Sequence, residues 1–142
     1  MGAKEGKVEI PLAQLIYGDV VYWLCVIAAI ICTIGPVIVT AFPDNNVLNP
    51  HYTFSAIFKG ETPTKVWKAT GQGFPGPHFY LEYPSAGDAI TMFGIALGCS
   101  SALWALIAAA IGGYLREKPR NYIYAAFCFW VAFIIFYAAA IR

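Results

Sequence analysis

The sequence predicts an all-α integral membrane protein with three transmembrane helices and a long ordered extracytoplasmic loop between the first two. Of its 142 residues, 59% are hydrophobic and only 12% are charged, whereas a soluble domain has about 25% charged residues. In addition, residues 20–43, 89–115 and 121–141 contain no Asp, Glu, Lys, Arg or His. Because a charge at the centre of a bilayer costs roughly 2.5–3.5 kcal/mol, these three windows predict the spans.

The first span is predicted over residues 20–42, a length that crosses a hydrocarbon layer with some tilt. Asp19 is expected to cap its N-terminus. A cleaved signal peptide is the alternative, since Val39-Thr40-Ala41 resembles a cleavage site, but the apolar stretch is longer than a signal peptide uses. Residues 1–19 are predicted to form a cytoplasmic segment, either a short interfacial helix opened by Pro11 or a lead-in turn.

The connection at residues 43–88 is predicted to be folded, because it contains eight aromatic residues against seven charged ones. Two short helices are expected in it, one over residues 53–59 that ends at Gly60 and one that is capped by Thr62 and ends at Gly71. Long ordered loops are usually functional surfaces. The loop residues expected to dock on a partner protein are Phe58, Trp67, Phe74, Phe79 and Tyr80.

The second span is predicted over residues 89–113, after a Ser85-Ala86-Gly87-Asp88 sequence that fits a helix-capping pattern. Small residues recur along this span at about the helical repeat of 3.6 residues and form one ridge. The ridge consists of Gly94, Gly98, Ala102, Ala105, Ala109 and Gly112. Since lipid gives helices no hydrophobic reason to associate, close contact through small residues drives their packing. The ridge is therefore predicted to be a helix-packing interface that docks on a neighbouring subunit.

The third span is predicted over residues 122–141 and follows a short link at residues 114–121. The basic residues of this link are Arg116, Lys118 and Arg120. Basic loops favour the cytoplasmic side of a membrane. The sequence thus predicts a cytoplasmic N-terminus, with the 43–88 loop and the C-terminus outside, in a bacterial cytoplasmic (inner) membrane.

Residues that carry chemistry are scarce. The predicted spans hold no ionisable acid or base and no His, so neither a proton relay nor a haem site with paired His ligands is expected. The four Cys residues all lie in the spans and are expected to remain free thiols. The formal net charge of +1 offers no field for nucleic acid. We expect no catalytic residue, no metal site and no enzymatic activity.

Two residues are candidates for cofactor binding. His78, in the loop, can hydrogen-bond a quinone carbonyl at the membrane surface. Trp130 lies near the middle of the third span, where its indole N–H lacks water and needs an acceptor. For Trp130, ordinary helix packing and a bound quinone or pigment are both open interpretations.

Four short stretches carry a family resemblance: Tyr17-Gly18-Asp19, Gly94, Arg116-Glu117-Lys118 and Tyr122-Ile123-Tyr124. In their order along the chain, they resemble a bacterial and archaeal family of small three-helix membrane proteins of uncharacterised function. That family is often associated with sulfite-exporter-like permeases. The resemblance implies three spans and assigns no activity.

The first functional hypothesis is a non-catalytic integral subunit of a larger membrane complex, of the electron-transfer or energy-converting kind. It would dock through its second helix and cap the outer surface with its loop. The alternatives are a permease accessory or small homo-oligomeric transporter, and a quinone- or pigment-binding membrane subunit. The expected partners are other membrane-protein subunits and the lipid bilayer. No cofactor is expected to be bound by this chain alone, while lipid or quinone can lie at its interfaces.

Overall fold

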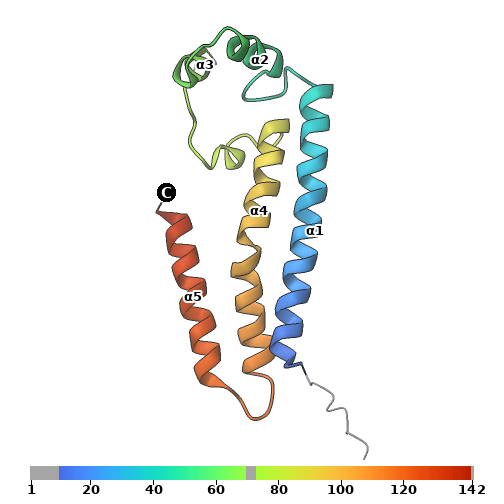
Figure 1. Ribbon diagram of the computed structural model, residues 1–142, viewed down its shortest axis with the longest axis vertical. Coiled ribbons are helices and arrows are strands. Elements are labelled where there is room, and N and C mark those ends of the chain that lie inside the picture. The colour runs from blue at the N-terminus through green and yellow to red at the C-terminus, as the bar shows by residue number, and fades with distance from the viewer. Residues whose placement is uncertain (1–9, 70–72, 142) are drawn as a thin grey trace, which may run out of the picture. The chain divides into compact units, whose positions relative to one another are not determined.

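The computed structural model describes residues 10–69 and 73–141, which are helical with turns and contain no β-strand (Figure 1). The α-helices are α1 (Leu12–Ala41), α2 (Pro50–Phe58), α3 (Pro63–Ala69), α4 (Gly87–Ala108) and α5 (Tyr122–Ala140). A 3-10 helix, η1 (Phe79–Leu81), precedes α4, and a π-helix, η2 (Ala109–Tyr114), follows it.

Three helical stretches are long and apolar enough to cross a membrane: Leu12–Ala41, Gly87–Tyr114 and Tyr122–Ala140. This confirms the predicted all-α fold class and the number of helices of spanning length. The chain divides into two compact units, and each is described by itself. One unit contains Met1–Trp23 with Ser100–Arg142, and the other contains Leu24–Cys99.

Helix α1 begins earlier than predicted. Its first residue is Leu12, and the N–H groups of Gln14 and Leu15 donate to the Pro11 carbonyl at 3.0 and 3.3 Å. Asp19 therefore lies within the helix, and the prediction that it is the N-cap is wrong. An exposed charge on a helix surface breaks no backbone hydrogen bond, so the charge at Asp19 does not end the helix. Of the segment predicted over residues 1–19, residues 1–9 lie outside the described residues.

The other long helices agree more closely with the sequence. Helix α5 covers Tyr122–Ala140, and the side chain of its N-cap, Asn121, accepts from the Tyr124 N–H at 3.5 Å. Helix α4 begins at Gly87 and is continued by η2. In η2 the Leu115 N–H donates to the Ala110 carbonyl, five residues back, at 3.0 Å. This wider turn has no signal in the hydrophobic pattern.

Close backbone contacts join the helices within each unit. In the Leu24–Cys99 unit, Gly35 of α1 lies directly against Thr91 of α4. In the other unit, Gly113 of η2 lies directly against Ala13 of α1, and α5 packs against η2. A side chain at either glycine would overlap the facing residue. Glycine at these positions is therefore what permits the close approach.

Candidate functional site

The carboxylate of Asp88 ties the segment after α1 to the start of α4. It accepts from the N–H groups of Val47 at 3.2 Å and Leu48 at 3.0 Å, and from that of Ala89 at 2.9 Å. Such bonds are strengthened by the charge of the acceptor and by the helix dipole. Asp88, the last residue of the predicted capping pattern, thus also holds Leu48, which lies 40 positions earlier in the chain.

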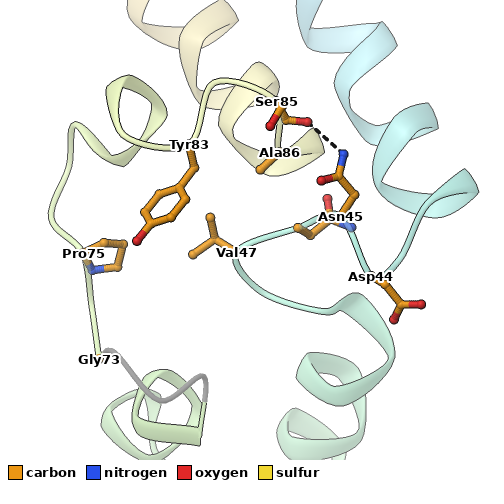
Figure 2. Close-up of a pocket in the computed structure, with 9 residues that line it drawn as sticks. Asp44, Asn45, Val47, Gly73, Pro75, Tyr83, Ser85 and Ala86 are labelled. Carbon is orange, nitrogen blue, oxygen red and sulfur yellow. Dashed lines mark hydrogen bonds between the residues drawn. The ribbon is translucent and has the colours of Figure 1, made fainter.

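Two asparagines hold the turn after α1. The Asn45 side chain donates to the Ser85 carbonyl at 2.9 Å (Figure 2), and its own carbonyl accepts from the Gly87 N–H at 3.2 Å. The Asn46 side-chain amide donates at 3.0–3.3 Å to three backbone carbonyls, one in the last turn of α1 and two just after the helix. These acceptors are the carbonyls of Val39, Phe42 and Pro43.

A small cavity lies beside this turn. Figure 2 shows its lining residues, with Tyr83 and Pro75 at the left, Val47 near the centre, and Asn45 and Ser85 farther to the right. Its volume is about 250 Å³, below the roughly 300–1,000 Å³ of small-molecule pockets. We interpret it as a gap between packed loop segments.

A compact apolar core lies next to these hydrogen bonds. Phe79, Ala86 and Ala89 are buried, and four partly buried residues pack around them. Those residues are Val47, Tyr80, Tyr83 and Met92. The core and the Asp88 contacts together connect residues 47–48 and 79–83 to the start of α4.

A larger groove of about 540 Å³ is formed by several elements of the same unit. Its apolar lining comes from α1, α2, α3, η1, α4 and the segment between α1 and α2, and its surface is almost entirely carbon. The apolar lining residues are Pro36, Val39, Leu48, Pro50, Phe54, Trp67, Phe79 and Met92. This groove is the candidate ligand site of the loop region, because its volume falls within the range of small-molecule pockets.

The predicted docking residues separate into different environments. Phe79 is only 7% exposed and belongs to the core, so its prediction as a docking residue is wrong. An aromatic ring buried within the chain has no surface to offer a partner. Tyr80 packs on the same core and on Phe93, and Trp67 lies edge-on to Phe74 with ring centroids 5.1 Å apart. Phe58 is 87% exposed.

The two candidate cofactor residues do not line the 540 Å³ groove. His78 is exposed, and its ring nitrogen lies 3.3 Å from the Tyr80 hydroxyl. Trp130 lies on α5 in the other unit and is exposed. A separate apolar groove in that unit, of about 480 Å³, is lined by Phe129 and Phe133 but not by Trp130. Both residues therefore stay predictions without a surrounding site.

The small-residue ridge contacts the chain's own first helix. Within one unit, Gly94 lies against Cys32 and Ile31 of α1, and Gly98 lies against Ala28. Within the other unit, Gly112 lies against Ile16. Of the other ridge residues, Ala105 and Ala109 are buried, and Ala102 is half-buried.

The three glycines of the ridge thus pack on α1 of the same chain. Docking of the ridge on a neighbouring subunit stays a prediction. The sequence did not reveal that the partner helix lies in the same chain. It also missed Gly35 and Gly113, which make the closest approaches. Gly35 stands in no repeated small-residue pattern, whereas Gly113 follows Ala105 and Ala109 at steps of four residues and was passed over in favour of Gly112.

Comparison with known proteins places the chain among its relatives. A protein-family model matches residues 13–141, which cover the three long helices except for Leu12. The chain belongs to this family. A relative from Archaeoglobus fulgidus, described as an uncharacterized protein, is 34% identical over 95 residues, or 66% of this chain. The chain spans 61% of that relative's length. No solved structure matches. Neither match concerns a permease, so the association with sulfite-exporter-like permeases stays a prediction.

Proposed function

We propose that this chain is a non-catalytic integral membrane subunit of a larger membrane complex, which it joins through exposed aromatic residues of its 43–88 loop. The observation that carries the proposal is the exposure of Phe58 at the end of α2. Phe58 and its neighbour Ile57 are exposed on a helix that belongs to none of the three spanning stretches. Exposed apolar clusters of this kind mark interaction surfaces.

The low burial of the spanning helices supports insertion in a bilayer. Only 11% of the apolar window is buried in α1 and in α5, against 28% in the Gly87–Tyr114 stretch. Large apolar side chains along α5 are exposed to the surroundings, among them Phe127, Phe133 and Phe136. Hydrocarbon, unlike water, accommodates such surfaces without cost.

For orientation, we propose that the link between η2 and α5 faces the cytoplasm and the 43–88 loop faces outwards. The link contains Arg116, Lys118 and Arg120, which are exposed and carry their positive charges at neutral pH. A basic link favours the cytoplasmic side. The membrane would then be the cytoplasmic membrane of a prokaryote.

For the kind of complex, we propose an electron-transfer or energy-converting assembly whose partners carry the cofactors. Asp19 and Asp88 are the charged residues of the three spanning stretches, and each lies toward one end of its stretch. Residues 20–41, 89–115 and 122–141 contain no charge. This disfavours the alternative of a transporter, since ion and proton paths through a membrane use ionisable residues. A quinone- or pigment-binding subunit is the other alternative, which an absorption spectrum and lipid extraction of the purified protein would test.

The test is recovery of the complex in mild detergent from native membranes. The wild-type chain is expected to co-purify with other polypeptides, and Phe58→Ser is expected to reduce their recovery severalfold. Ile123→Ser, at a similarly exposed residue at the start of α5, is the matched control and should leave recovery unchanged. A wild-type chain that elutes as a monodisperse monomer without partners would contradict the proposal.

A further inference from the structure

The 540 Å³ groove of the Leu24–Cys99 unit has polar residues at its edge, and all of them make hydrogen bonds within the chain. The Thr40 hydroxyl donates to the Pro36 carbonyl at 3.0 Å, and the Thr53 hydroxyl donates to the Asn49 carbonyl at 2.9 Å. The Thr91 hydroxyl donates to the Gly87 carbonyl at 3.1 Å.

The carboxylate of Asp88 also lies at the edge of the groove, where it accepts from three backbone N–H groups. The hydroxyl protons of the three Thr residues are thus already used, and the lining surface of the groove is almost entirely carbon. This lining favours an apolar occupant.

The size of the groove separates a hydrocarbon chain from a partner helix. One turn of an α-helix with its side chains, about 10–12 Å wide and 5.4 Å long, occupies roughly 420–610 Å³. The groove, at about 540 Å³, would hold a single turn. A spanning helix needs many turns of contact, whereas an extended hydrocarbon chain is narrower than a helix and needs less volume for each unit of length.

We propose that this groove binds one acyl chain of a membrane lipid. The inference rests on the proposed membrane location, because the groove lies where the apolar helix α1 ends and the apolar helix α4 begins, the level expected for the bilayer surface. Trp67 and Phe54 form apolar walls on the loop side, and Pro36 and Met92 form walls on the long helices. The bound chain would fix the loop to the bilayer.

The test uses Trp67 as a fluorescent reporter in the full-length chain, purified in detergent. Trp23, Trp104 and Trp130 are exposed, so replacing them with Phe leaves Trp67 as the sole Trp. Phosphatidylcholine brominated on its acyl chain is then titrated into the sample, because bromine in contact with an indole quenches its fluorescence. The proposal expects saturable quenching at about one lipid per chain.

A matched pair of variants tests the location of the lipid. Phe54 lines the groove and is 61% exposed, whereas Ile57 on the same helix is 58% exposed and does not line it. Phe54→Asp should raise the half-saturating lipid concentration at least about tenfold, and Ile57→Asp should leave it unchanged. Thr40→Phe, which adds a ring at the groove wall without adding charge, should also weaken binding.

The remaining outcomes decide against the proposal. Quenching that grows without saturation, or equally in Phe54→Asp and the parent, would overturn it. Saturable quenching by a short-chain benzoquinone, but not by the brominated lipid, would show a different occupant and also overturn it. The proposed function fails independently if alkaline carbonate extracts the chain from membranes, since the titration is made in detergent and does not depend on that result.

Discussion

Replacing Asp88 with Ala should release the segment after α1 from the start of α4. The carboxylate accepts two backbone N–H groups of that segment, from Val47 and Leu48, in a partly buried position. A hydrogen bond to a charged group contributes about 1.5–3 kcal/mol. Taking the lower end, because water replaces part of each bond, the two together contribute about 3 kcal/mol. At 1.4 kcal/mol per factor of ten, local opening should become roughly 100-fold more frequent.

Hydrogen exchange of detergent-solubilised protein measures this opening directly. In Asp88→Ala, the amides of Val47 and Leu48 should exchange roughly 100-fold faster than in the wild type. Asp44→Ala is the matched control, because Asp44 is exposed and, among the residues that the structure describes, accepts only one long bond, from Asn49 at 3.3 Å. Unchanged exchange at Val47 and Leu48 in Asp88→Ala, or equal effects of both substitutions, would refute the assigned role of the carboxylate.

Two further predictions concern packing and capping. Gly94→Ala should destabilise the protein by about 1–3 kcal/mol, because the added Cβ would lie 2.8 Å from the Cys32 sulfur; Gly98→Ala, whose Cβ would meet Ala28 at 3.4 Å, should be nearly neutral. Thermal unfolding in detergent compares the two, and equal stabilities would show that α1 does not constrain Gly94. Asn49→Ala should cost about 1 kcal/mol by removing the N-cap of α2, which accepts from a backbone N–H at 3.0 Å; hydrogen exchange of α2 should rise roughly fivefold, and exchange at the wild-type rate would contradict this role.

The positions of charged residues predicted the ends of the long helices well where a charged residue lies just outside the helix. Helix α5 is flanked by the basic link and by Arg142, and its observed bounds, Tyr122–Ala140, differ from the predicted 122–141 by one residue. The rule failed at α1, because Asp19 can lie on an exposed helix surface while the backbone remains helical. The proline before the helix, Pro11, was the better boundary signal.

The short helices of the loop were predicted from Gly, Pro and Thr signals, with small differences. Helix α2 begins at Pro50, before the predicted residue 53, since Asn49 caps it. Helix α3 follows Thr62 as expected, and the Gly71 predicted to end it lies outside the described residues. Gly60 follows α2 with φ of 72°, the left-handed conformation that glycine favours after a helix.

The candidate site was harder to predict from the sequence than the helices were. Aromatic composition indicated an ordered loop, but it did not distinguish buried Phe79 from exposed Phe58. That distinction depends on tertiary contacts with Ala86 and Ala89, which no local pattern encodes. In the same way, a ridge of small residues predicts close packing but does not identify the partner helix.

Labelling of single cysteines in intact cells tests the central claim most directly, namely that the chain spans a membrane with its loop outside and its basic link in the cytoplasm. In a background with all four native Cys replaced, Phe58→Cys and Lys118→Cys place one thiol in each exposed region. We predict that a membrane-impermeant maleimide labels Phe58→Cys in intact cells and labels Lys118→Cys only after permeabilisation. Equal labelling of both variants in intact cells, or the reverse pattern, would contradict the claim.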